Sequence, residues 1–181
     1  MNAFAACATN EIDVLGDGTQ CETSKFEVTT TSDATSLVWT MSATGEFYAD
    51  CGDSGILSQD TSSYGTISGA TITRTSTSVT TYTCTWDTAD THTIRFGGTA
   101  TGYNTSTTTA AISFYKSSSG TQARVASIDG SLGAMFPVVN GNIPRFSHTF
   151  AKTQITSIPA GLFSEIDTSS ATDTKIGRAH V

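Results

Sequence analysis

The feature that most constrains the fold of this chain is an alternation of apolar and polar residues with a period of two. Phe26 and Val28 alternate with polar neighbours, and the pattern returns in residues 37–41 and 47–51. Because successive side chains of a strand point to opposite faces, such runs predict half-buried β-strands. The same pattern continues, separated by short clusters of Gly, Ser and Asp that favour turns, in residues 71–74, 79–86, 91–96 and 108–115. About seven short strands with tight turns predict an antiparallel β-sandwich.

The chain draws its polarity from hydroxyl groups more than from charges. Of its 181 residues, 35 are Thr and 23 are Ser, whereas 14% are charged. The β-branch of Thr fits a pleated strand, and both side chains compete for the backbone hydrogen bonds of a helix, so the composition argues against an all-α fold. The net charge of −7, with scattered basic residues, argues against a nucleic-acid partner. No apolar run approaches the ~20 residues of a membrane span.

The composition of the sequence changes near residue 116. Residues 97–103 are rich in glycine, which weakens strand interiors, and are expected to bend the chain before the last strand instead of forming a central one. After a polar segment, apolar residues become denser, and all three prolines lie in this later part. A second unit is therefore expected to begin between residues 117 and 123. We accordingly divide the chain into an extension at 1–24, a sandwich at 25–116 and a second unit at 117–175.

The second unit contains a phrase of about 20 residues with the form of a repeat. Residues 155–163 read Ile-Thr-Ser-Ile-Pro-Ala-Gly-Leu-Phe, and Phe150 precedes them. This phrase resembles the BspA-like leucine-rich repeats of bacterial surface proteins. The resemblance implies that residues 117–175 begin a truncated leucine-rich-repeat solenoid, since a single repeat cannot bury its own apolar face without stacked neighbours. The repeat core implied by it consists of Phe150, Ile155, Ile158, Leu162 and Phe163.

Surface proteins of this kind often carry an Ig-like or PKD-like sandwich before the repeats. Residues 47–55, and residues 82–86 followed by 92–94, resemble two strand phrases of those sandwiches. Cys51 and Cys84 replace a Trp and a His of the pattern, at positions that face each other across neighbouring strands in that fold. The resemblance implies an Ig/PKD-like sandwich over residues 25–116 and a location in a secreted or cell-surface protein.

Four cysteines in such a chain indicate two disulfides, for which three pairings are possible. Cys51 and Cys84 each share the phase of the apolar residues of their strands, so both are expected to point into the core. This parity favours a Cys51–Cys84 disulfide and leaves Cys7 to pair with Cys21. Zinc binding is the rival interpretation, and it is disfavoured because the chain has no Cys-x-x-Cys pair and no ligand-like spacing of histidines. No metal and no cofactor is therefore predicted.

Both ends of the sequence contain segments that are not expected to belong to the mature protein. Ala3-Phe4-Ala5 has the small-x-small form of a signal-peptidase site, so the extension at 1–24 is expected to begin with the remnant of a secretory signal. Residues 176–181, Ile-Gly-Arg-Ala-His-Val, resemble the conceptual translation of a common sequencing adapter. The chain is thus expected to be a metagenomic fragment whose protein part continues beyond Lys175.

Several polar constellations invite a functional interpretation. Gly52-Asp53-Ser54-Gly55 looks like the nucleophile segment of chymotrypsin-like proteases, but no histidine precedes Ser54, and a β-turn explains the same residues. His92 and His148 are expected to be structural residues, with one satisfied ring nitrogen each. The aspartates that follow the strands have the right chemistry for Ca²⁺, although turn formation is the favoured interpretation for Asp50, Asp53, Asp60, Asp87 and Asp90. No residue is predicted to be catalytic.

These features together predict a non-catalytic binding or adhesion module of a secreted or cell-surface bacterial protein, with a protein or glycan ligand. Two alternatives stay open. The first is a carbohydrate-binding accessory module of an extracellular hydrolase, and the second is a structural stalk or virion-fibre segment.

Overall fold

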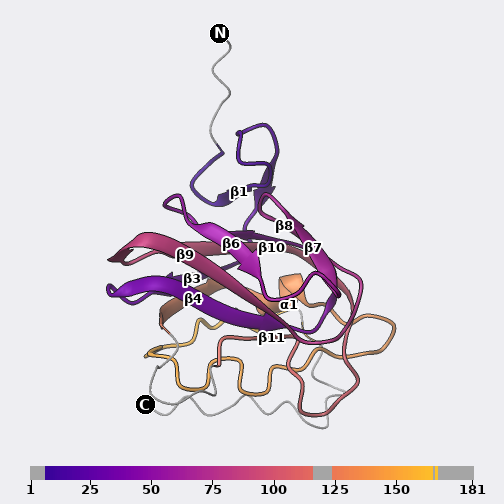
Figure 1. The fold of residues 1–181 in the computed structure, drawn as a ribbon. Coiled ribbons are helices and arrows are strands. Elements are labelled where there is room, and N and C mark those ends of the chain that lie inside the picture. The colour runs from indigo at the N-terminus through magenta and orange to yellow at the C-terminus, as the bar shows by residue number, and fades with distance from the viewer. Residues whose placement is uncertain (1–6, 116–123, 165, 167–181) are drawn as a thin grey trace.

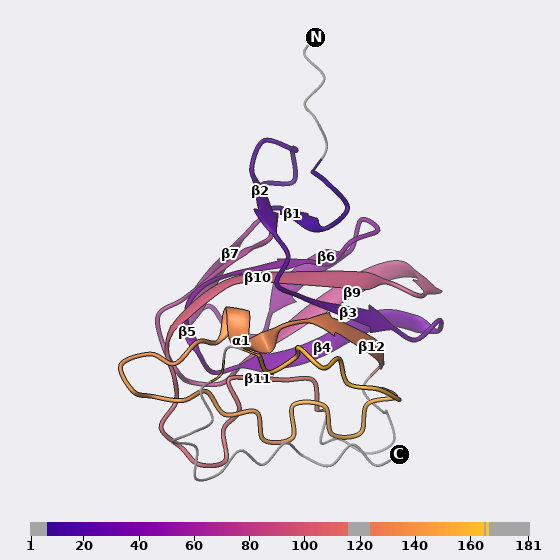
Figure 2. The same cartoon turned by 180° about the vertical axis from the view of Figure 1, so that it is seen from behind.

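The structure is a computed structural model, and it describes residues 7–115, 124–164 and 166. Two antiparallel sheets face each other, and a small hairpin lies outside them (Figures 1 and 2). The larger sheet has the strand order β12 (Val125–Gly130), β3 (Phe26–Thr30), β10 (Thr93–Gly102), β5 (Thr44–Asp50), β8 (Thr71–Arg74) and β7 (Gly65–Ser68). The smaller sheet has the order β11 (Ile112–Ser113), β4 (Ala34–Met41), β9 (Thr80–Asp90) and β6 (Ile56–Gln59). The mainly-β, antiparallel fold class is confirmed.

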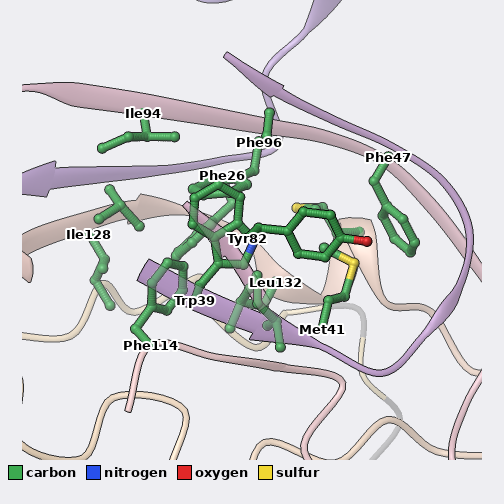
Figure 3. Packing of buried hydrophobic residues seen from close by; sticks show 14 of the residues in the cluster. Phe26, Trp39, Met41, Phe47, Tyr82, Ile94, Phe96, Phe114, Ile128 and Leu132 are labelled. Carbon is green, nitrogen blue, oxygen red and sulfur yellow. The ribbon is translucent and has the colours of Figure 1, made fainter. Parts of the chain in front are cut away.

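The hydrophobic core lies between the two sheets. The apolar positions of the period-two pattern are the buried ones, as the alternating burial along β3 and β4 shows. Trp39 of β4 meets Phe96 of β10 edge-on, with ring centroids 5.2 Å apart, and stacks on Tyr82 of β9 at 5.8 Å (Figure 3). Each aromatic side chain removes roughly 150–250 Å² from water, so this cluster is a major source of the sandwich's stability.

The chain changes sheet at almost every connection. Ser42 and Ala43 carry it from β4 to β5, and Thr91 and His92 carry it from β9 to β10. Among the strands of the two large sheets, β7 and β8 are the one consecutive pair within a single sheet. Strands that are neighbours in a sheet are therefore distant in sequence, as in the pairing of β4 with β9.

The glycine-rich segment differs from its prediction. Residues 97–102 belong to β10, a central strand that pairs with both β3 and β5. Glycine is required there by close approach: a Cβ on Gly98, whose φ is +84°, would lie 2.2 Å from the backbone oxygen of Glu46. A Cβ on Gly97 would lie 3.1 Å from the side chain of Ile12, which packs above it. The missing side chains thus make room for neighbours on two sides of the strand.

The N-terminal extension forms a hairpin on the outer face of the six-stranded sheet. Strands β1 (Glu11–Asp13) and β2 (Cys21–Thr23) pair with each other, and Ile12 is fully buried against β10 and β5. The Cys7–Cys21 disulfide joins the segment before β1 to the first residue of β2. The expected signal-peptidase site at residues 3–5 lies outside the described residues, as does the adapter-like segment at 176–181.

The described residues from 124 onward pack with the sandwich. β12 is an edge strand of the six-stranded sheet, and it is followed by the single helical turn α1 (Leu132–Met135). Residues 145–154 then run between the edges of the two sheets: Ala111 N–H donates to Arg145 O and Phe114 N–H to Thr149 O, while Gln154 N–H donates to Val125 O. This segment closes one side of the sandwich, opposite the N-terminal hairpin (Figures 1 and 2). The expected boundary at 117–123 lies entirely outside the described residues.

No solenoid is seen in the described part of residues 117–175. The repeat-like phrase adopts successive turns, and three of its five expected core residues, Phe150, Ile155 and Leu162, are buried in the sandwich core. Phe163 is half-buried against the same core. Ile158 is 43% exposed, so it does not belong to the core of this structure. Its segment is irregular and precedes Pro159, and within the described residues no strand lies beside it.

Candidate functional site

The Cys51–Cys84 disulfide joins the two sheets at one end of the sandwich. Cys51 is the first residue after β5 of the six-stranded sheet, and Cys84 lies in β9 of the four-stranded sheet. Both residues are buried, with their Cα atoms 5.6 Å apart. The Cys51–Cys84 pairing is the one that side-chain parity predicted, and Cys7–Cys21 is the pair that it left. The parity argument succeeds because it depends on strand phase, which the sequence displays.

The loop after Cys51 has an unusual backbone. Gly52, Asp53 and Ser54 all adopt positive φ, at 58°, 45° and 61°, in the left-handed region that non-glycine residues rarely enter. The loop wraps around the indole of Trp86, whose Nε1–H donates to the carbonyl oxygens of Cys51 at 3.1 Å and Gly52 at 3.3 Å. The sequence prediction of a turn at 52–55 is consistent with the hydrogen bond from Gly55 N–H to Gly52 O at 2.7 Å.

His92 lies beneath this loop, almost completely buried, and each of its ring nitrogens faces an oxygen. Nδ1 is 3.1 Å from Oδ2 of Asp53, and Nε2 is 3.3 Å from the carbonyl oxygen of Thr88. The ring stacks on Trp86 with the centroids 4.1 Å apart and the planes 2° from parallel. The sequence predicted one satisfied ring nitrogen for His92 and no link to Asp53, whereas the structure brings the two residues together.

The proximity of Asp53 and His92 can be inferred only from the pairing of β5 with β10. Arg95 of β10 lies opposite Asp50 of β5 in an antiparallel ladder. Residues that follow Asp50 must therefore lie near residues that precede Arg95, which places Asp53 beside His92. Because β5 and β10 are more than 40 residues apart, no local pattern reveals that they pair.

The geometry of the Asp53–His92 pair does not suit general-base catalysis. A catalytic base needs a ring nitrogen within reach of a substrate proton, and both nitrogens of His92 are occupied by protein oxygens. The ring itself is covered, with 3% of the residue exposed. The contact instead attaches the exposed Asp53 carboxylate to the stacked His92 and Trp86 rings, so its role is structural.

A second candidate is an open hollow of about 590 Å³ between the N-terminal hairpin and the outer face of the six-stranded sheet. Its charged lining residues are Glu11, Asp13, Asp17, Asp50 and Arg95. Several of these side chains already bind other groups of the protein. The Asp13 carboxylate accepts from the N–H groups of Gly16 and Gly18, both at 2.8 Å, and Arg95 pairs with Glu27 at 3.2 Å. Hydrogen bonds from the Thr19 hydroxyl and N–H lower the pKa of Asp17 below its ordinary value.

The residues that could bind a metal instead form a disulfide or accept hydrogen bonds from the backbone. The ligand atoms of Cys7, Glu11 and Cys21 lie within 4.8 Å of one another, but the two sulfur atoms form a disulfide and so offer no thiolate to zinc. The carboxylates of three aspartates accept from nearby backbone N–H groups, as expected of turn residues: Asp50 from Gly52, Asp60 from Thr81 and Asp90 from Thr91. They form no metal-ligand group in the described part of the chain.

A third surface is the outward face of the four-stranded sheet, which faces the viewer in Figure 1. Registration across β4, β9 and β6 places Ser36, Thr85 and Ile56 in one row and Val38, Thr83 and Ser58 in the next. Thr40 lies beside Thr81 and Ser113 in a third row. None of these residues is charged, although the exposed Asp60 lies opposite Thr81 at the β6 side of the third row. The outward face of the six-stranded sheet carries Glu27, Arg95, Asp50 and Glu46.

Comparisons with protein-family models, with curated proteins and with solved structures each find no match for this chain. Across the described residues, no helix has the length and apolar character needed to cross a membrane.

Proposed function

We propose that this chain is a non-catalytic binding module of a secreted or cell-surface protein and that its ligand is a neutral glycan. The single observation that carries the choice of ligand is the hydroxyl-rich face of the four-stranded sheet, which holds no basic residue in these rows and one acidic residue, Asp60, at the β6 side. Two disulfides support the secreted location, because disulfides persist mainly in oxidising compartments. The engaged nitrogens of His92 support a non-catalytic role.

The chemistry of the face favours a neutral partner over an anionic one. An anionic ligand that docked there would lose hydration without gaining an opposite charge, which costs free energy. Hydroxyl groups, in contrast, both donate and accept hydrogen bonds, and so match the hydroxyls of a sugar chain. The exposed Ile56, with Val38 in the next row, adds apolar contact of the kind that the carbon face of a sugar ring accepts.

The test is a depletion assay in which the full chain is mixed with insoluble cellulose, mannan or starch and, as a charged comparison, immobilised heparin. We expect retention by at least one neutral polysaccharide and none by heparin. Thr85→Glu should weaken retention about tenfold, equivalent to about 1.4 kcal/mol, because it places a charge on the binding face.

Thr73→Glu is the matched control, since Thr73 is also an exposed strand threonine but lies on β8 of the other sheet. It should leave retention unchanged. The proposal fails if no neutral polysaccharide retains the protein, or if both substitutions have equal effects.

We also propose that the sandwich is Ig/PKD-like and that residues 145–164 represent the first turn of a BspA-like leucine-rich repeat. The first idea is supported by an inter-sheet disulfide next to a buried tryptophan, an arrangement known from immunoglobulin domains. The second is supported by the stacking of two turns, in which Leu132 N–H of α1 donates to Leu162 O at 2.8 Å. In this proposal the sandwich covers one end of a solenoid in a surface adhesin.

A further inference from the structure

The hydrogen-bond inventory around His92 determines which form of its ring fits the site. Thr88 contributes a carbonyl oxygen, and Asp53 contributes a carboxylate, which is acceptor-only when ionised. A neutral imidazole donates through one nitrogen only, so one of the two contacts would then set a lone pair against an oxygen. The imidazolium form donates through both nitrogens. Both contacts are therefore hydrogen bonds only when the ring is protonated.

The surroundings of the ring also favour a cation. Its stacking partner is the indole of Trp86, the aromatic face that attracts cations most strongly. Apart from Arg95, the charged residues from the neighbouring elements are acidic: Asp87 and Asp90 come from β9, and Asp50 and Asp53 from the end of β5 and the loop after it. The contacting residue of β3 is the uncharged Thr30, whose hydroxyl accepts from the His92 backbone N–H at 2.9 Å. Arg95 of β10 is already paired with Glu27.

The element that responds to loss of the proton is the loop at 52–55. Asp53 and Ser54 hold a left-handed backbone that costs free energy and persists only under restraint. The Thr88 carbonyl is part of β9, whereas the Asp53 side chain is 64% exposed and can turn into water at little cost. When the ring donates through one nitrogen only, the contact with Asp53 is thus the one that breaks.

We propose that the Asp53–His92 pair is a protonation-controlled latch. With a protonated ring, the latch holds loop 52–55 closed over Trp86 and the Cys51–Cys84 disulfide. With a neutral ring, the loop is released and this end of the sandwich becomes accessible to solvent. The latch is a property of the fold and is independent of the proposed glycan ligand.

Two-dimensional NMR of the full chain tests the latch, because the protein has two tryptophans whose indole N–H groups report separately. The Trp86 indole donates to the loop carbonyls, whereas the buried Trp39 Nε1 has no hydrogen-bond partner among the described residues. Between roughly pH 5 and 8, where histidines change charge, the Trp86 indole and the loop amides should shift along one common curve. The Trp39 indole should not follow that curve.

His92→Gln should abolish the common shift, and His148→Gln should preserve it, because His148 is an exposed histidine elsewhere in the structure. Asp53→Ala removes a side chain that is 64% exposed and whose carboxylate faces His92, and it provides the second variant should His92→Gln fail to fold. It should leave the loop amides unprotected from hydrogen exchange throughout the pH range. The latch is refuted if the loop amides of the unmodified protein do not titrate, or if their titration persists in Asp53→Ala.

Discussion

At the scale of single residues, the buried Arg74 shows how a charge is accommodated by neutral groups. Its Nε donates to Ala43 O at 2.7 Å, and its Nη1 donates to the Tyr82 hydroxyl at 2.9 Å. Its Nη2 donates to Ser76 O at 2.9 Å and to Ser78 O at 2.5 Å. The guanidinium thus connects the loop after β4, the loop before β9 and the core. All four acceptors are uncharged, so their geometry must compensate for the loss of hydration.

Arg74→Lys should lower the free energy of unfolding by about 2–4 kcal/mol, because the ammonium group cannot reproduce the planar fork and leaves buried oxygens without donors. Urea unfolding of the purified protein measures this change. Arg124→Lys is the control, since Arg124 forms an ion pair with the exposed Asp33, and it should change stability by less than about 0.5 kcal/mol. Equal effects of the two substitutions would contradict this account.

Tyr48 provides a prediction for alkaline pH. The hydrogen bond from its hydroxyl to Glu46, together with partial burial and the negative charges of Glu46 and Glu22, raises the pKa of Tyr48 to about 12. An unfolded tyrosine ionises near pH 10. Because the folded pKa is higher, this contribution to stability is complete below about pH 10 and is lost as the pH rises toward about 12.

The corresponding measurement is urea unfolding at several pH values across that window. Tyr48→Phe should show a smaller loss of stability with rising pH than the unmodified protein, since it has no hydroxyl to ionise. An identical pH dependence in the two proteins would refute the assignment.

At the scale of elements, the two disulfides have different tasks. The Cys51–Cys84 bond spans 33 residues and joins the two sheets, whereas the Cys7–Cys21 bond spans 14 residues and closes a hairpin that lies outside them. The first therefore constrains the packing of the sandwich, and the second constrains only a local attachment.

Removing the first disulfide with Cys51→Ala and Cys84→Ala should lower the free energy of unfolding by about 4 kcal/mol, as the chain-entropy relation gives for that loop length. Cys7→Ala with Cys21→Ala should speed hydrogen exchange in β1 and β2 while shifting the global unfolding midpoint much less. Chemical denaturation and exchange mass spectrometry distinguish these outcomes. A similar global loss from both double variants would show that the hairpin is part of the cooperative unit.

At the scale of the whole molecule, the C-terminal segment completes the sandwich. The Phe150 ring is parallel to Phe114 within 6°, at 5.7 Å, and lies 6.3 Å from Phe26, so residues from both sheets depend on it. A further aromatic chain links Phe47 of β5 to Phe136 at 5.7 Å and Phe136 to Phe146 at 5.9 Å. One core therefore includes residues on both sides of the expected domain boundary.

Phe150→Ala should destabilise the protein by about 3–5 kcal/mol, because it leaves a cavity in this shared core. Ile158→Ala, at an exposed position of the same repeat-like phrase, should change stability by less than about 0.5 kcal/mol. Unfolding followed by tryptophan fluorescence is a suitable probe, since both tryptophans lie far from residue 150 in sequence. If Phe150→Ala left the tryptophan transition unchanged, the C-terminal segment would be an independent unit.

The sequence by itself determined the features that depend on strand phase. The inward positions of residues 37–41, the inward direction of Cys51 and Cys84, and the antiparallel β class all follow from a period of two. The tertiary structure alone decided the features that depend on which strands become neighbours. It placed the glycines of β10 in a central strand, brought Asp53 to His92 and closed the sandwich with residues 145–154. The physical reason is that phase is repeated within a few adjacent residues, whereas pairing is set by contacts between distant segments that compete for the same core.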